Sequence, residues 1–179
     1  MDANVLIDFC EADRTLLRLV SEHIGPVHVP LPILREEVQD LLADEDHAEL
    51  GIVPIEPTLE AATEAAGKRA GLSFYDQLCL VLARDNGWTC VTNDGRLRRE
   101  CETEKIPVLW GLETIAILVD ADVLPVAEAE RIGQAIQRSN PRFITDRVMT
   151  GFLERIGAGP KKPKPKPRRP RRRGESKTS

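Results

Sequence analysis

Short β-branched runs alternate with longer segments of helical period through the first two thirds of this chain of 179 residues. The β-branched runs predict strands at residues 27–29, 51–55, 88–92 and 107–109. The helical period predicts helices over residues 32–42, 58–69, 73–85, 94–104 and 111–118. This alternation favours an α/β sandwich around a mostly parallel sheet.

The last third of the chain divides into a helical part and a tail. Helices are predicted at residues 125–138 and 145–156. From Gly157 onward, glycine and alternating proline, lysine and arginine leave almost nothing to bury, so a disordered tail is predicted. The expected units are therefore residues 1–118, a helical extension at 119–157 and a tail at 158–179.

The net charge of −4 averages an acidic body and a basic tail. All but one of the 29 acidic residues precede residue 160, whereas 10 of the 25 Lys and Arg residues follow it, so residues 1–159 carry a net charge of −13. Such a body repels a polyanion, and the tail is predicted either to contact nucleic-acid phosphates or to aid solubility. The candidate phosphate-binding residues are Lys161, Lys162, Lys164, Lys166, Arg168, Arg169, Arg171, Arg172 and Arg173.

Composition disfavours several other classes of protein. The longest apolar runs are far shorter than the roughly 20 residues of a membrane span, and the acidic start is unlike a secretory signal. The four cysteines form no CxxC pair, which is typical of buried thiols in a cytoplasmic protein. Seven aromatic residues argue against a base-stacking platform for single strands. We therefore expect a cytoplasmic protein without a membrane partner.

Acidic residues lie where predicted strands pass into helices. Because ligands of open α/β sheets bind beyond the carboxyl ends of the strands, these carboxylates are expected to point into one space. Carboxylates that share a site need a cation, and oxygen-only ligation suits Mg²⁺ or Mn²⁺. The candidate metal-binding and catalytic residues are Asp2, Glu36, Glu37, Asp76 and Asp94.

Each of these acids also has a structural interpretation. Ser73 and Asp76 have the spacing of a capping box, and Asp94 is an ordinary N-cap. Glu36 and Glu37 would complement a helix dipole. The sequence by itself leaves the catalytic and the structural interpretations open.

Five motifs occur in order along residues 1–118. They read D-A-N-V-L-I-D, P-I-L-R-E-E-V, L-S-F-Y-D-Q-L-C-L-V-L-A, C-V-T-N-D-G-R-L-R-R and I-P-V-L-W-G. Together they resemble the ordered motifs of PIN domains, and the pairing of L-S-x-x-D with the downstream T-x-D-x-x-L is the most specific part. The resemblance implies a three-layer α/β/α sandwich and a metal-dependent nuclease. Many PIN domains are VapC-like toxins of bacterial toxin–antitoxin pairs that cut RNA.

The resemblance also implies roles for single residues. Asp2 matches the first metal-binding acid, Asp76 the third and Asp94 the fourth, while the second is Glu36 or Glu37, depending on the register. Polar residues near the metal are implied at Asn4, Thr92 and Asn93. Hydrolysis of RNA with Mg²⁺ or Mn²⁺ is the implied reaction, with an antitoxin and a second copy of the chain as possible partners.

The sequence departs from the family pattern at its start. In PIN domains the first aspartate ends an apolar strand, whereas only Met1 precedes Asp2 here, so either the coding sequence begins further upstream or the protein manages without that strand. The alternative function is a catalytically inactive PIN-fold protein that binds nucleic acid or regulates another molecule. Arg96, Arg98 and Arg99 are interpreted either as phosphate contacts or as a solvated helix face.

Overall fold

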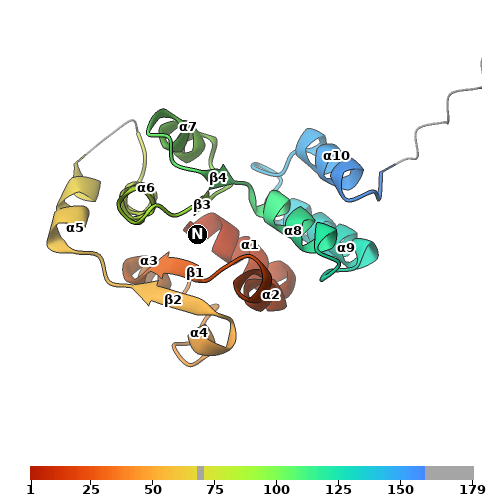
Figure 1. The fold of residues 1–179 in the computed structure, drawn as a ribbon, viewed down its shortest axis with the longest axis horizontal. Helices are drawn as coiled ribbons and strands as arrows, with labels where there is room; N and C mark the ends of the chain where they lie inside the picture. The colour runs from red at the N-terminus through yellow and green to blue at the C-terminus, as the bar shows by residue number, and fades with distance from the viewer. Residues whose placement is uncertain (68–70, 160–179) are drawn as a thin grey trace, which may run out of the picture.

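The computed structural model describes residues 1–67 and 71–159, and Figure 1 shows their arrangement. The first half contains α1 (Ala3–Asp13), α2 (Thr15–His23), β1 (Val27–Pro30), α3 (Leu31–Glu36), α4 (Asp46–Glu49), β2 (Ile52–Ile55) and α5 (Leu59–Ala66). The second half contains α6 (Phe74–Asn86), β3 (Cys90–Val91), α7 (Gly95–Thr103), β4 (Val108–Leu109), α8 (Gly111–Asp120), α9 (Val126–Ser139) and α10 (Asp146–Arg155). Among these helices, none is long and apolar enough to cross a membrane.

The strands form two parallel pairs. β1 pairs with β2 from Val27 opposite Ile52 to Pro30 opposite Ile55, and β3 pairs with β4 through Cys90 opposite Val108. The start of α1 lies between the two pairs (Figure 1). The predicted α/β class with parallel strands is confirmed, with the pairing divided into two sheets of two strands each.

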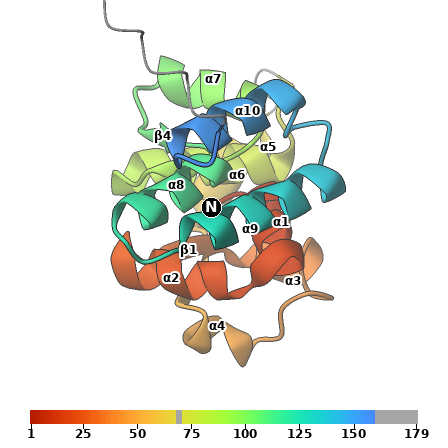
Figure 2. The same ribbon diagram turned by 90° about the vertical axis from the view of Figure 1, so that its right-hand side faces the viewer.

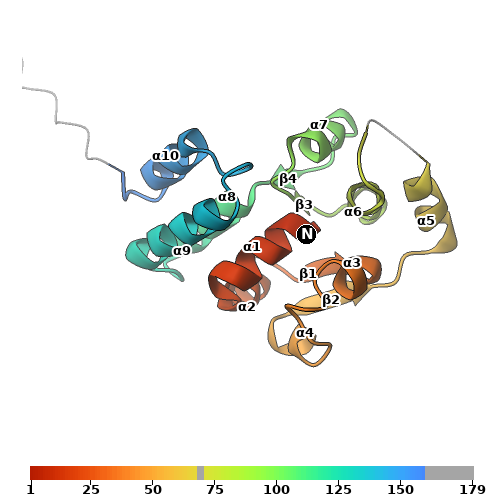
Figure 3. The ribbon, with the colours of Figure 1, turned by 180° about the vertical axis from the view of Figure 1, so that it is seen from behind.

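Helices lie on both sides of these strands. α5 and α6 pack together on one side, and α6 contacts β1 and β3. On the other side α1 packs against α9 and α2 against α8, while α10 contacts α8 and α9. Figures 2 and 3 show α8, α9 and α10 gathered at the end of the molecule opposite α5.

One continuous apolar core joins the N-terminal helices to the last ones. Its largest fully buried side chains come from α1, α2, α3, α6, α7, α8 and α9, and each of these helices turns its apolar face toward the same interior. They are Leu6, Phe9, Leu16, Leu17, Ile33, Leu78, Leu80, Leu97, Ile115, Leu118, Ile132 and Ile136. The four cysteines are free thiols, buried except for the half-buried Cys10.

Most predicted elements are present, and three differences stand out. No helix was predicted before residue 27, yet α1 and α2 occupy most of that segment. The helix predicted over residues 32–42 ends at Glu36, because the Ile33 carbonyl accepts both the Glu37 and the Val38 amides and the chain then turns. The strand predicted at 88–92 pairs only over β3. The predicted basic tail and residues 68–69 of the predicted 58–69 helix lie outside the described residues.

Candidate functional site

Asp2 occupies the position between the two sheets. The backbone amide of Asp2 donates to the Val91 carbonyl at the end of β3, and Asp2 is only 1% exposed. It is also the N-cap of α1, where Oδ1 accepts the Val5 amide at 2.9 Å. Oδ2 accepts a hydrogen bond from the Thr92 hydroxyl. The carboxylate is therefore fixed from both sides.

The environment of Asp2 disfavours its charged form. Burial raises the pKa of the Asp2 carboxyl to about 6, with a smaller contribution from the negative charge of Asp76. The hydrogen bonds from Thr92 and Val5 and the nearby N-terminal ammonium of Met1 act in the opposite direction. A divalent cation at this carboxylate would replace the solvation that burial removes.

Asp76 lies in the first turn of α6 and forms the capping box that its spacing with Ser73 predicts. Asp76 Oδ2 accepts the Ser73 amide at 3.1 Å and the Ser73 hydroxyl at 2.8 Å. Ser73 Oγ in turn accepts the Asp76 amide at 3.1 Å. Oδ1 takes part in none of these contacts. The structural interpretation of Asp76 is thus confirmed, and its charge also acts on Asp2.

Asp94 is the N-cap of α7 and is connected to Asp2 through one side chain. Its Oδ1 accepts the Arg96 and Leu97 amides at 2.6 and 3.0 Å. The Asp94 amide donates to Thr92 Oγ at 2.9 Å, and the same hydroxyl donates to Asp2. Thr92 is fully buried, so it sets the position of Asp94 relative to Asp2.

Glu36 and Glu37 differ in their contact with α6. The Tyr75 hydroxyl donates to Glu36 Oε2 at 2.5 Å, and the hydrogen bond to this carboxylate raises the pKa of Tyr75 to about 12. Tyr75 precedes Asp76 in the chain, so this contact connects Glu36 to the helix that carries Asp76. Glu37 follows α3 as an exposed residue that acts on Tyr75 through its charge only. Of the two candidates for the second acid, Glu36 is therefore the one that forms a hydrogen bond with α6.

Asn93 belongs to a second buried polar group, which sequence reasoning missed. Its Nδ2 donates to Asp8 Oδ2 at 2.9 Å, and its Oδ1 accepts the Gly111 amide at 3.0 Å. Asn140, between α9 and α10, donates to both oxygens of Asp8. Burial raises the pKa of Asp8 to about 6, although the hydrogen bonds from the two amide donors act to lower it. Asp8 lies three residues after buried Val5 on α1, and this helical spacing was a signal available in the sequence.

Asn4 and the arginines of α7 surround these groups. Asn4 lies half-buried in the first turn of α1. Arg98 stacks over the Trp110 ring at 4.2 Å and pairs with Glu102 and Glu113, so it serves the local structure. Arg96 and Arg99 are exposed and remain candidates for phosphate contacts.

The structure relates Asp2 to both Asp76 and Asp94, and the last two direct oxygens toward helix ends. The negative charge of Asp76 raises the pKa of Asp2, and the Thr92 hydroxyl forms hydrogen bonds with both the Asp2 carboxylate and the Asp94 amide. Even so, residues 1–67 and 71–159 contain no group of three or more His, Cys, Asp or Glu that could hold a metal ion. Asp76 and Asp94 do not complete such a group with Asp2, because each directs carboxylate oxygens to the amides at the start of its own helix. The donors still fit a hard cation chemically, since a carboxylate has about four lone-pair sites and each cap uses only some of them.

Comparison with known proteins gives one match. A family model described as PIN domain matches residues 1–102, a segment that runs from α1 into α7 and contains all five candidate acids. The searches of curated proteins and of solved structures gave no match.

Proposed function

The chain belongs to the PIN domain family, and from this premise we propose that it is a Mg²⁺- or Mn²⁺-dependent endoribonuclease. PIN domains are generally nucleases, which supports a nuclease role with a nucleic-acid substrate. One observation carries the proposal further: a buried carboxylate, Asp2, lies beside Asp76 and is joined to Asp94 through Thr92. A buried acid whose charged form is disfavoured by its surroundings is typical of a functional site.

The roles follow from what each side chain contacts. Asp2, Asp76 and Asp94, with Glu36 as the favoured second acid over Glu37, would hold the cation. When bound, a divalent ion lowers the pKa of water and offsets negative charge on phosphoryl oxygens. Thr92 holds the Asp2 carboxylate in one orientation through its hydroxyl and fixes the start of α7 through the Asp94 amide. Tyr75 restrains Glu36 beside α6.

The substitution Asp76→Asn tests the proposal in the full chain. Asparagine keeps a carbonyl oxygen for the Ser73 cap but removes the charge, so we expect cleavage of single-stranded RNA with Mn²⁺ to fall by about a hundredfold or more. The thermal midpoint should change by less than about 2 °C. Asp40→Asn, at an exposed turn residue, is the matched control and should cleave like the wild type.

Two results would contradict the nuclease proposal. One is wild-type cleavage that persists in excess EDTA, and the other is an Asp76→Asn variant as active as the control. A calorimetric titration with Mn²⁺ adds a readout besides activity: binding to the wild type should be weakened in Asp76→Asn and retained in Asp40→Asn.

The engagement of Asp76 and Asp94 as helix caps favours a second candidate, a catalytically inactive PIN-fold protein that binds nucleic acid or regulates a partner. This candidate predicts RNA binding without cleavage in Mg²⁺ or Mn²⁺. It also predicts that Asp76→Asn leaves RNA affinity unchanged. Incubating labelled RNA with the purified chain and measuring both binding and chain length separates the two functions.

Finer assignments within the nuclease proposal concern the biological role. We propose an RNA-cutting toxin in the cytoplasm, with an antitoxin as its partner and a homodimer as its assembly. Expression of the wild type should then arrest growth, expression of Asp76→Asn should not, and co-expression of a protein encoded beside it should relieve the arrest. Light scattering of the purified chain measures the mass of the assembly.

The basic tail is proposed as the part that attracts RNA to an acidic body. Its nine Lys and Arg residues at 161–173 lie outside the described residues, so the proposal rests on charge alone. If all of them meet phosphates of a single strand, the log–log dependence of affinity on salt has a slope of about −6. Deletion of residues 160–179 should weaken binding and flatten that slope, whereas an unchanged slope would leave solubility as the tail's role.

A further inference from the structure

Two carboxylates at α1 hold two consecutive residues of the segment that follows β3. Asp2, the N-cap of the helix, accepts the Thr92 hydroxyl, and Asp8, further along the helix, accepts Asn93 Nδ2 at 2.9 Å. The next residue is Asp94, whose amide donates to Thr92 Oγ at 2.9 Å. Because both attachments lead to one helix, the position of Asp94 relative to Asp2 depends on both of them.

The Asn93 side chain is buried in a close fit between α1 and α8. Its Oδ1 accepts the Gly111 amide at the start of α8 at 3.0 Å. A Cβ at Gly111 would lie 3.3 Å from both polar atoms of the Asn93 side chain and equally close to Val5 of α1. An amide enclosed in this way is costly to leave without its acceptor, so Asn93 depends on the Asp8 carboxylate.

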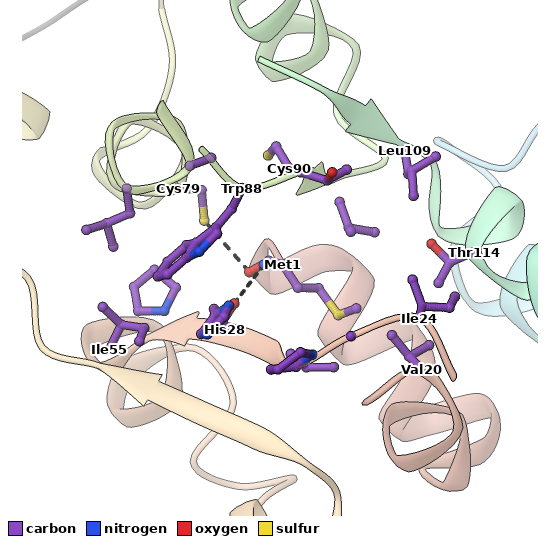
Figure 4. A pocket seen from close by; sticks show the side chains of 18 of the residues that line it. Met1, Val20, Ile24, His28, Ile55, Cys79, Trp88, Cys90, Leu109 and Thr114 are labelled. Carbon is purple, nitrogen blue, oxygen red and sulfur yellow. Dashed lines mark hydrogen bonds between the residues drawn. The ribbon is translucent and has the colours of Figure 1, made fainter. Parts of the chain in front are cut away.

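The packing around β3 increases the importance of these side-chain contacts. β3 consists of two residues that pair with β4, and toward β1 it borders a cavity of about 360 Å³. Figure 4 shows Cys90 and Leu109 on the wall of this cavity, with Met1 lying between Cys90 and His28. Side chains at a cavity have fewer packing partners, so the strand by itself restrains the following segment only weakly.

The helical extension provides a second donor to Asp8. Asn140, between α9 and α10, donates from Nδ2 to Asp8 Oδ1 at 3.0 Å and to Oδ2 at 3.2 Å. The backbone of Asn140 is fixed on both sides, because its amide donates to the Ile136 carbonyl at 2.8 Å and its carbonyl accepts the Ile144 amide at 3.0 Å. Ile136 and Ile144 are buried, so Asn140 extends to Asp8 from a well-packed part of the extension.

These contacts form one connected path from the extension to the candidate site. Asn140 contacts Asp8, and Asp8 contacts Asn93 in the segment after β3. We propose that Asn140, acting through Asp8, is a positioning residue by which the helical extension holds Asp94 at the candidate site. Asn140 lies beyond residue 102, where the match to the family model ends. The expected effect on metal binding rests on the proposed function, whereas the expected effect on the segment itself does not.

Amide exchange in the metal-free full chain tests the position of the segment. In Asn140→Ala, exchange of the Asp94 and Gly111 amides should become faster by about tenfold or more relative to that of the Cys90 amide, which donates to Pro107 within the sheet. The matched control is Phe152→Leu, which loosens the packing of Phe152 on Gly133 in the same extension and removes no hydrogen bond to Asp8. It should leave the relative exchange rates of these amides unchanged.

Titration with Mn²⁺ separates positioning from general stability. At a temperature at which every variant is folded, Asn140→Ala should bind Mn²⁺ about tenfold more weakly than the wild type, and Phe152→Leu should bind it equally well. The kcat for RNA cleavage should fall by about the same factor, with KM changed by less than about twofold, because the path ends at the metal site. In an Asp8→Ala background, Asn140→Ala should weaken Mn²⁺ binding no further, because the path is already interrupted.

The failure of this proposal differs from the failure of the nuclease proposal. Relative exchange rates that are equal in Asn140→Ala and Phe152→Leu overturn the positioning role, whatever the chain binds. A wild type that binds Mn²⁺ and an Asn140→Ala variant of equal affinity overturn it as well. Faster Asp94 exchange in Asn140→Ala, in a chain whose wild type neither binds Mn²⁺ nor cleaves RNA, supports the positioning role and overturns the nuclease proposal alone.

Discussion

The surroundings of Asp2 and the helices α8 to α10 bury opposite kinds of side chain. Around Asp2, the buried residues include Asp8, Thr92 and Asn93, held by hydrogen bonds between segments far apart in the chain. The region from α8 to α10 instead buries a run of aliphatic and aromatic side chains that contact one another. These are Leu112, Ile115, Ala116, Leu118, Ala129, Ile132, Ile136, Met149 and Phe152.

The difference indicates that the helical region from α8 to α10 stabilises the fold, whereas the buried carboxylates around Asp2 destabilise it. Burial raises the pKa of both Asp2 and Asp8 to about 6, so at neutral pH each holds a negative charge that its surroundings disfavour. Apolar burial at about 25 cal/mol per Å² in the helical region offsets that cost. Asn140 joins the two regions, because it extends from the α9–α10 connection to the Asp8 carboxylate.

The largest effect on stability is expected in the helical region. Phe152→Ala removes a buried ring that packs on the Gly133 face of α9, where even an added Cβ would lie 2.5 Å from the ring. The free energy of unfolding should fall by about 3–5 kcal/mol in urea denaturation. Phe74→Ala, at a ring 39% exposed, is the control and should cost less than about 1 kcal/mol. Equal losses in the two variants would refute the assigned role of α10.

Substitution of Asn140, which connects the two regions, should have an intermediate effect on stability. Asn140→Ala removes one of the two amide donors to Asp8, so the free energy of unfolding at neutral pH should fall by about 1–3 kcal/mol. The same substitution in an Asp8→Asn background should cost less, because no buried charge is then left with fewer donors. A double-mutant cycle by urea denaturation measures this coupling, and a coupling energy of zero would show that Asn140 does not support Asp8.

The pH dependence of stability isolates the charge of Asp8. Its folded-state pKa, about 6, lies above the usual value of 3.8, so its contribution to stability is present below about pH 4 and is lost as the pH rises through 6. Between these values the free energy of unfolding should fall by on the order of 1–2 kcal/mol. Asp8→Asn should reduce this slope, and the remaining slope of the same sign is assigned to Asp2. An Asp8→Asn variant with the same pH dependence of stability as the wild type would contradict the assignment to Asp8.

The local parts of the fold were predictable from the sequence, because short-range rules govern them. The β-branched runs indicated the four strands of the described residues, and Ser73 and Asp94 cap α6 and α7 as predicted. The helices before residue 27 were missed, although the residues buried there have helical spacing, with Leu6 three residues before Phe9 and Leu16 four before Val20. The helix over 32–42 was predicted too long, since burial of Val38 and Leu42 does not require helical backbone.

The candidate site depends on contacts that no local rule reveals. Sequence spacing gave both interpretations of Asp76 without the means to choose between them. The contact that favours Glu36 over Glu37 comes from Tyr75, 39 residues away, and one of the two amide donors to Asp8 lies 132 residues away. Such pairs become visible only when the fold brings distant segments together, which is why Asp8 and Asn140 escaped the sequence analysis.

The smallest effect, and the one that best separates capping from metal binding, is expected at Ser73. Ser73→Ala removes the hydroxyl that accepts the Asp76 amide and donates to Asp76 Oδ2, so α6 should lose about 1 kcal/mol of stability. Because the Asp76 carboxylate then has one contact fewer, its affinity for Mn²⁺ should stay the same or rise in a calorimetric titration. Thr58→Ala removes the corresponding cap of α5, and it should cost a similar amount of stability without changing Mn²⁺ affinity. A clear loss of Mn²⁺ affinity confined to Ser73→Ala would mean that the capping arrangement itself holds Asp76 in place for the metal.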